Sequence, residues 1–218
     1  MRISVLGAGA WGTALAVHAA HAQPTLLWGR DGDQIAACEK TRSNDRYLPG
    51  VRFPDALTLT ADLAAAIDAG SGADGLLIVA TPLSGLAGVC ATLAARAQPV
   101  SNLIWLCKGL EPDTAALPHQ IVEREFAGVP ASQRPAFGAL SGPSFAAEVG
   151  RGLPCALTIA TASPALAAIV QRAFHHRAMR IYDTTDLVGV EVGGAVKNIM
   201  AVATGAGDGL GLGYNARA

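Results

Sequence analysis

The sequence lacks any large excess of charge of one sign. Its 218 residues carry 16 Lys and Arg against 17 Asp and Glu, which gives a formal net charge of -1. It also lacks a polybasic run, so composition supplies no field that would attract nucleic acid or an anionic membrane surface. Function must therefore come from local sites.

Cysteine is scarce and scattered. Cys38, Cys90, Cys107 and Cys155 form no CxxC pair and no cluster with histidine, which argues against a disulfide framework and against a metal site. The first apolar run ends at Gly7, too short for the core of a signal peptide, and no apolar run approaches the roughly 20 residues of a membrane span. We expect a cytoplasmic protein with neither a nucleic-acid partner nor an integral-membrane segment.

Short apolar runs alternate with alanine-rich segments of helical character, in a chain of 51% hydrophobic residues. The runs predict buried strands at Ile3–Leu6, Thr25–Trp28, Gly75–Ala80, Leu103–Cys107 and Ala136–Leu140. Helices are predicted between them at Ala10–His21, Asp31–Lys40, Thr60–Asp68, Leu83–Ala97 and Thr114–Phe126. This alternation is typical of an α/β fold, a Rossmann-type doubly wound parallel sheet.

The composition of the chain and its pattern of predicted elements change after Asp183. Before it, a strand at 156–160, a helix at 164–174 and a strand at 179–182 extend the pattern of the first domain. Beyond it, Val188–Gly211 is rich in Gly, Ala and Val and predicts one long buried helix. We expect a dinucleotide-binding domain over residues 1–183 and the beginning of an all-helical domain over 184–218, in a chain truncated inside that second domain.

A glycine-rich turn follows the first strand directly and opens the first helix. Its sequence, Gly7-Ala8-Gly9-Ala10-Trp11-Gly12, matches the dinucleotide fingerprint GxGxxG in its proper strand-to-helix context. Gly7 permits the tight turn, Gly9 leaves room for a pyrophosphate, and Gly12 lets the helix pack close to the strand. The exposed N–H groups at the helix start then hold the phosphates, with Trp11 as a wall of the site.

The second strand ends in Leu27-Trp28-Gly29-Arg30-Asp31, where an acidic residue that binds the ribose of NAD is expected. The strand tip carries no carboxylate. Arg30 stands where a guanidinium would meet the 2'-phosphate of NADP. The pattern favours NADP, while Asp31 keeps NAD binding open and a solvated role remains the alternative for Arg30.

Three further segments contain the candidate chemistry. Lys108-Gly109-Leu110-Glu111 and Ser141–Glu148 each follow a predicted strand, where open α/β sheets place their ligands. Lys197 lies inside the long Gly/Ala/Val helix, and partial burial there would lower its pKa towards the range of a proton donor and acceptor. The alternatives for Lys197 are a side chain that extends to the helix surface or one paired with Glu191.

Together these motifs resemble the NAD(P)-dependent glycerol-3-phosphate dehydrogenases. The resemblance rests on the phosphate turn, Arg46–Gly50, the segment at Lys108, SGPSFAAEV, and above all GAVKNIMAVATGAGDGLGLGYN at 194–215. It implies a 6-phosphogluconate dehydrogenase-like helical second domain and reversible hydride transfer between NAD(P)H and dihydroxyacetone phosphate. The product, sn-glycerol 3-phosphate, feeds phospholipid synthesis, and a homodimer is expected of the full-length protein.

The resemblance also implies roles for individual residues. Lys197 matches the proton donor and acceptor. Substrate-binding positions fall on Lys108, Gly142, Ser144, Lys197 and Asn198, and cofactor-binding positions on Gly7, Gly9, Ala10, Trp11, Gly12, Arg30, Lys108 and Ala146. Ala10 departs from the serine that is common in the family, which removes one hydroxyl from the phosphate site. The family's later acidic residue and its phosphate-gripping arginine segment belong beyond Ala218, so we expect this chain to bind cofactor and to turn over poorly.

Two other interpretations stay open on the sequence alone. One is a related ketoacid or hydroxyacid reductase with a Rossmann domain and a helical second domain, which shares the helix-borne lysine. The other is a dinucleotide-binding module without catalysis. Fold analogy cannot choose between them.

Overall fold

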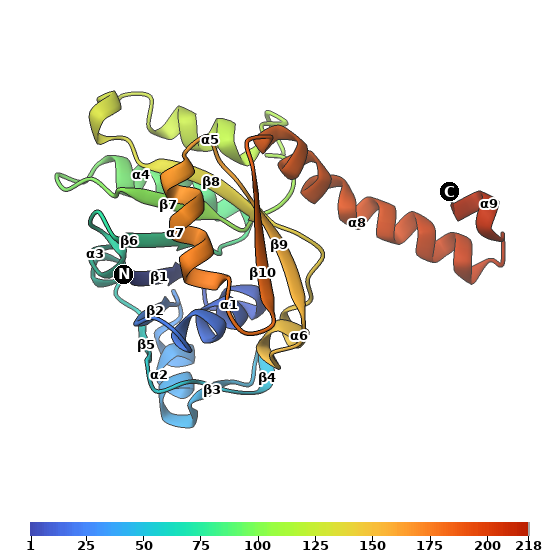
Figure 1. Ribbon diagram of the computed structural model, residues 1–218, viewed down its shortest axis with the longest axis horizontal. Coiled ribbons are helices and arrows are strands. Elements are labelled where there is room, and N and C mark those ends of the chain that lie inside the picture. The colour runs from blue at the N-terminus through green and yellow to red at the C-terminus, as the bar shows by residue number, and fades with distance from the viewer. Residues whose placement is uncertain (218) are drawn as a thin grey trace.

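The computed structural model describes residues 1–217, with the side chain of Asn198 left out of the description. The chain forms an eight-stranded sheet with helices on both faces, from which one long helix extends (Figure 1). The strand order is β10-β9-β8-β7-β6-β1-β2-β5. Their bounds are β1 Arg2–Leu6, β2 Thr25–Trp28, β5 Leu57–Thr60, β6 Gly75–Val79, β7 Asn102–Trp105, β8 Ala136–Ser141, β9 Cys155–Ala160 and β10 Met179–Thr184.

The apolar strands have hydrophobic cores on both faces, because successive side chains of a strand point to opposite sides. In β6, Leu76 and Ile78 join one core while Leu77 and Val79 join the other. Helices α1 Ala10–Ala20, α2 Gly32–Thr41 and α7 Pro164–Phe174 contribute buried residues to the first core. Helices α3 Leu63–Gly70, α4 Leu86–Ala94 (preceded by a 3-10 turn at Leu83–Gly85) and α5 Pro118–Glu125 contribute to the second.

The predicted Rossmann-type fold is confirmed, with one departure in strand direction. β1 pairs in parallel with β2 on one side and β6 on the other, so the chain order reverses between β1 and β6. Ligands of open α/β sheets bind at such a switch point. β9 runs antiparallel to β8, because the connection between them contains only the short helix α6 Ala146–Gly150, which packs against α1 instead of crossing the sheet.

Several small elements were not predicted. The edge strand β5 covers part of the segment expected to begin a helix at Thr60, and that helix begins instead at Leu63 after its cap Asp62. A separate hairpin is formed by β3 Ser43–Asn44 and β4 Leu48–Arg52. A 3-10 turn spans Ala131–Gln133, and α9 spans Tyr214–Arg217.

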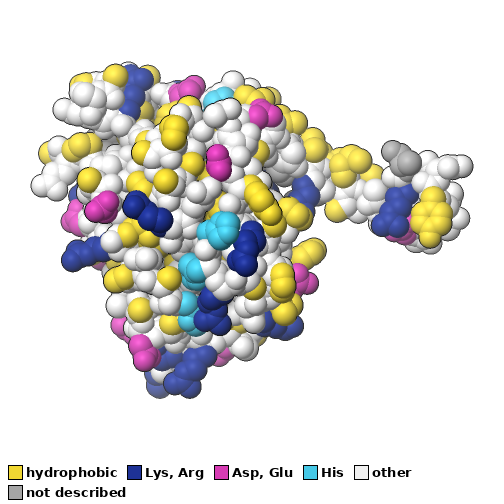
Figure 2. Space-filling view, in the orientation of Figure 1, with side chains coloured by type: hydrophobic (Ala, Val, Ile, Leu, Met, Phe, Trp, Pro, Cys, Tyr) yellow, Lys and Arg dark blue, Asp and Glu magenta, His cyan; other side chains and the backbone are white. Residues whose placement is uncertain are grey.

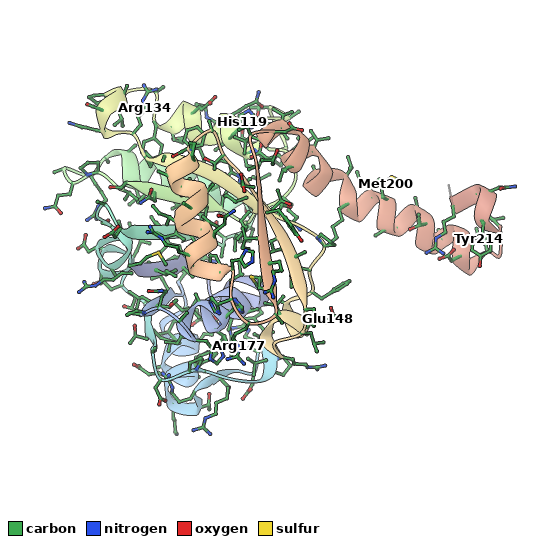
Figure 3. All side chains as sticks on the ribbon, viewed as in Figure 1. His119, Arg134, Glu148, Arg177, Met200 and Tyr214 are labelled. Atoms are coloured by element: carbon green, nitrogen blue, oxygen red, sulfur yellow. The ribbon has the colours of Figure 1, made fainter. Side chains whose placement is uncertain are left out.

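The long helix is α8, Leu187–Gly209, close to the predicted range. The prediction that this helix is buried is wrong. Among the residues that the structure describes, only the first turns of α8 pack on β8 and β9. Met200 and Tyr214 lie on the extension beyond the body (Figure 3), and apolar side chains line it (Figure 2). Ile199 is 68% exposed and Val202 is 73% exposed.

By length and composition alone, α8 is long and apolar enough to cross a membrane. This corrects the expectation that no apolar stretch approaches that length. The core helix of a soluble protein passes the same test. The buried carboxylate of Glu191 and the packing of the first turns on the sheet place the start of α8 within the folded body.

Candidate active site

The phosphate turn joins β1 to α1 at the switch point of the sheet. Gly7 has a φ of +137°, and a Cβ there would lie 2.6 Å from the carbonyl oxygen of Ala80. A Cβ on Gly12 would lie 2.0 Å from the Gly7 oxygen, so the start of α1 and the turn are packed too closely for any side chain. Around Gly9, by contrast, a Cβ would meet nothing within 4 Å. The turn is therefore close-packed at both ends and open at Gly9.

The start of α1 fits the pyrophosphate of a dinucleotide. Gly9 is the N-cap residue, no side chain caps the helix, and its first turn contains no acidic residue. The N–H groups of a helix start need acceptors, and the helix dipole favours an anion there. Trp11 lies half-buried against the first core just inside this end. Ala10, at the first helical position, supplies backbone only.

At the end of β2, the two charged candidates lie in different surroundings. The Asp31 carboxylate caps α2, accepting a hydrogen bond from Gln34 N at 3.1 Å, and pairs with Arg46 at 3.4 Å. Arg30 is exposed and makes no ion pair with any residue that the structure describes. The carboxylate is thus already engaged, whereas the guanidinium is accessible to an anionic ligand.

A cavity of about 310 Å³ brings together the three segments singled out in the sequence. Lys108, just after β7, lines it together with Ser141 and Gly142 at the end of β8. Gly194 and Lys197 of α8 also line it. Ser144 lies next to this lining, with its hydroxyl 3.5 Å from the Gly142 oxygen, and Ala146 begins α6. The candidate residue Asn198 has its side chain outside the described part of the chain.

Two ammonium groups face this cavity. Lys108 Nζ donates to the Gly142 oxygen at 3.4 Å, and burial, followed by the positive charge of Lys197, lowers the pKa of Lys108. Lys197 is half-buried, with its Nζ 5.7 Å from the centroid of the Phe145 ring. A Cβ on Gly194 would lie 3.4 Å from both Lys108 Cγ and Ser141 Oγ, so the glycine lets α8 approach them closely. The cavity is suited to an anionic ligand.

Glu191 does not pair with Lys197, which removes that alternative. Its side chain is buried, and Oε1 accepts hydrogen bonds from Trp105 Nε1 at 3.0 Å and from His119 N at 2.9 Å. Oε2 is hydrogen-bonded to His119 Nδ1. Burial raises the pKa of Glu191, and these bonds act in the opposite direction. The hydrogen bonds of Glu191 to Trp105 and His119 were not predicted from the sequence. The only signal for them there is a carboxylate inside an apolar helix.

Comparison with known proteins agrees with this geometry. The family model for the N-terminus of NAD-dependent glycerol-3-phosphate dehydrogenase matches residues 2–167, and that for its C-terminus matches residues 186–218. The chain belongs to this family. Membership decides against the open alternative of a related ketoacid or hydroxyacid reductase.

Curated relatives of this glycerol-3-phosphate dehydrogenase family member are longer than the chain. It is 58% identical to glycerol-3-phosphate dehydrogenase (NAD(P)+) of Ralstonia nicotianae and 57% identical to that of Cupriavidus necator, over all of the chain but 64% and 65% of those proteins. It is also similar to the crystal structure of glycerol-3-phosphate dehydrogenase from Coxiella burnetii. That match has a TM-score of 0.87 at 33% identity, over 99% of this chain and 63% of the other. The chain thus spans slightly less than two-thirds of the length of these relatives.

Proposed function

We propose that this chain belongs to an oxidoreductase that interconverts dihydroxyacetone phosphate and sn-glycerol 3-phosphate with NAD(P)H. The observation that carries the proposal is the convergence of Lys108 and Lys197 on one cavity, at the carboxyl ends of parallel strands, the side of the sheet where the phosphate turn also lies. A phosphorylated ketone supplies both the anionic charge that two ammonium groups favour and a carbonyl for reduction. The relatives from Ralstonia nicotianae and Cupriavidus necator are glycerol-3-phosphate dehydrogenases, which supports the same reaction.

Lys197 is proposed as the proton donor and acceptor. Its ammonium protonates the carbonyl oxygen of the substrate during reduction, and the neutral amine takes the proton back from the alcohol in the reverse direction. Lys108, Gly142, Ser144 and Asn198 are proposed to bind the substrate. Positive charge on Lys108 would stabilise the oxygen as negative charge develops on it. The half-buried position of Lys197 gives its ammonium access to the cavity.

The proposed cofactor is NADP, with NAD as a weaker ligand, and it supplies the hydride when bound. Gly7, Gly9, Ala10, Trp11 and Gly12 would hold the pyrophosphate and its surroundings. Arg30 would bind the 2'-phosphate, with Lys108 and Ala146 at the other end of the cofactor. The open space at Gly9 and the exposed guanidinium support this assignment.

At the level of the whole protein, we propose a cytoplasmic enzyme whose product enters glycerophospholipid synthesis, and a homodimer for the full-length protein. The domains are proposed to span residues 1–183 and 184–218. The structure has β10 ending at Thr184 and α8 beginning at Leu187, close to that boundary.

The 218-residue chain is expected to bind NADPH but to reduce dihydroxyacetone phosphate slowly. Phe145, next to Lys197, is 69% exposed, so water reaches the site, and water weakens electrostatic stabilisation of a transition state. NADPH oxidation by the purified chain, measured beside the Ralstonia relative, checks this. A rate equal to that of the relative would contradict it.

Replacement of Lys197 tests the mechanism. We expect Lys197→Met to lower turnover by at least about 100-fold, the usual contribution of a general acid, while NADPH affinity changes little. Lys40→Met, on the exposed side of α2, is the matched control and should keep the wild-type rate. Unchanged turnover in Lys197→Met would refute the role of that lysine. Equal reduction of carboxylated and phosphorylated ketones would refute the proposed substrate class.

A further inference from the structure

Two amide side chains converge on the backbone carbonyl of Ala8, inside the phosphate turn. Gln34 Nε2 donates to the Ala8 oxygen at 3.0 Å, and Asn44 Nδ2 donates to it at 3.0 Å. Gln34 comes from α2 and Asn44 from the hairpin strand β3, 26 and 36 residues further along the chain. The turn is thus held from outside its own sequence.

The amide of Asn44 has every polar atom paired. It is fully buried, its second N–H bond points to Thr13 Oγ1 at 2.8 Å, and its oxygen accepts from Gln34 Nε2 at 3.4 Å. A backbone carbonyl only accepts hydrogen bonds, so the amide nitrogens must face Ala8. Buried networks with all partners satisfied hold one arrangement, since every alternative leaves a polar atom unpaired.

Fixing the Ala8 carbonyl also fixes the N–H of Gly9. Both belong to the same planar trans peptide, in which C=O and N–H point in opposite directions. With the carbonyl held towards Asn44 and Gln34, the Gly9 N–H points to the other side, where the helix start is uncapped. We propose that Gln34 and Asn44 are positioning residues that orient the phosphate turn for the pyrophosphate of the dinucleotide.

The Arg46–Gly50 stretch belongs to the hairpin β3–β4, which carries Asn44. Leu48 and Val51 are buried, and a Cβ on Gly150 of α6 would lie within 3.1 Å of both side chains. The hairpin also packs against α1. The contacts of β4 with α1 and α6 hold the hairpin where Asn44 reaches the turn, so the conformation of this stretch affects cofactor binding without contact to the cofactor.

This inference rests on the proposed binding of NAD(P)H, and affinity for both dinucleotides tests it. We expect Asn44→Ala and Gln34→Met each to weaken NADPH and NADH alike by about tenfold, because the two cofactors share the pyrophosphate. The ratio of the two affinities should stay constant, whereas loss of the Arg30 guanidinium, the proposed partner of the 2'-phosphate, should change it. Gln34 is only half-buried, so its variant folds even where Asn44→Ala proves unstable.

Asn102→Ala is the matched control. Asn102 is buried, and its amide donates to two backbone carbonyls, Ala73 at 3.0 Å and Gly75 at 2.9 Å, at the amino ends of β6 and β7, away from the phosphate turn at the carboxyl end of β1. It should lose thermal stability as Asn44→Ala does, but keep cofactor affinity. Equal affinity losses in the Asn44 and Asn102 variants, or a loss confined to one cofactor in the Gln34 and Asn44 variants, would overturn the proposal.

Hydrogen exchange of the backbone amides from Gly9 to Gly12, measured without ligand, tests the same contacts independently. We expect faster exchange in the Asn44 and Gln34 variants than in Asn102→Ala. If the unaltered chain binds neither dinucleotide, the proposed function fails, and the exchange rates still decide whether these side chains hold the turn. Unchanged exchange would overturn the positioning role.

Discussion

Lys108 and Lys197 place two positive charges at one cavity. Burial, and after it the positive charge of Lys197, lowers the pKa of Lys108, so the two ammonium groups destabilise each other's charge. An anion between the two side chains would relieve that repulsion. The residues that would bind the substrate are therefore held in an arrangement that a phosphate group would stabilise.

At the scale of one residue, replacement of Arg30 tests the preference for NADPH over NADH. Because its guanidinium is exposed and unpaired among the described residues, Arg30→Ala should weaken NADPH by about tenfold or more and NADH by much less. Titration of both cofactors measures this. Arg172→Ala, an exposed arginine on α7, is the control and should bind both normally. Equal losses for the two cofactors would rule out a contact between Arg30 and the 2'-phosphate.

At the scale of elements, α8 is joined to the sheet through Glu191. The buried carboxylate accepts bonds from β7 through Trp105 and from the start of α5 through His119. These bonds fix the first turns of the helix, from which Gly194 and Lys197 reach the cavity. A helix that is mostly exposed further along is thus held firmly at the end that bears the candidate site.

Replacing Glu191 by an apolar residue should weaken the attachment of α8 to β7 and α5 and lower the stability of the fold. Glu191→Leu leaves the N–H groups of Trp105 and His119 unpaired in the interior, at a cost of about 1–3 kcal/mol each. Glu191→Gln keeps an acceptor, and since burial raises the pKa of the carboxyl, loss of its charge should cost less. Urea unfolding compares the two, with Glu148→Leu on the exposed surface as control. If the Leu and Gln variants prove equally stable, the hydrogen bonds do not anchor α8.

The sequence predicted the elements whose signal is local. Most residues of β1, β6 and β7 are apolar, and the glycine turn has a recognisable spacing. The hairpin β3–β4 was missed because one strand has two residues and the other contains Pro49 and Gly50, both unfavourable in strands. The contact of Asn44 with Ala8 and that of Glu191 with Trp105 were missed because they join residues 36 and 86 positions apart, which no local pattern specifies.

At the scale of the whole molecule, the first and last crossover helices meet at a group of histidines, visible among arginines in Figure 2. His18 of α1 is buried, with its Nε2 3.0 Å from the carbonyl oxygen of Phe174, the last residue of α7. Its ring stacks on His176, with the centroids 4.2 Å apart. His21 and Arg177 add further positive charge nearby. Protonation of His18 would place a charge in a dry site next to other cations.

This contact should make the fold sensitive to acid. Burial, and to a smaller extent His176, His21 and Arg177, lowers the pKa of His18 from 6.5 to about 4. The unfolded chain therefore binds a proton below pH 6.5 that the folded chain takes up only near pH 4. The stabilisation is complete above pH 6.5 and is lost as the pH falls through that interval, by up to roughly 3 kcal/mol.

Urea unfolding as a function of pH measures this contribution. His18→Gln keeps an N–H donor for the Phe174 oxygen but has no proton to gain, so its stability should fall less steeply between pH 6.5 and 4 than that of the unaltered chain. At neutral pH the two proteins should differ little, which separates the titration of the ring from its packing. Parallel stability curves across this interval would show that His18 is not the group responsible, and would leave His21 and His176, whose pKa values burial also lowers, as the candidates at this junction.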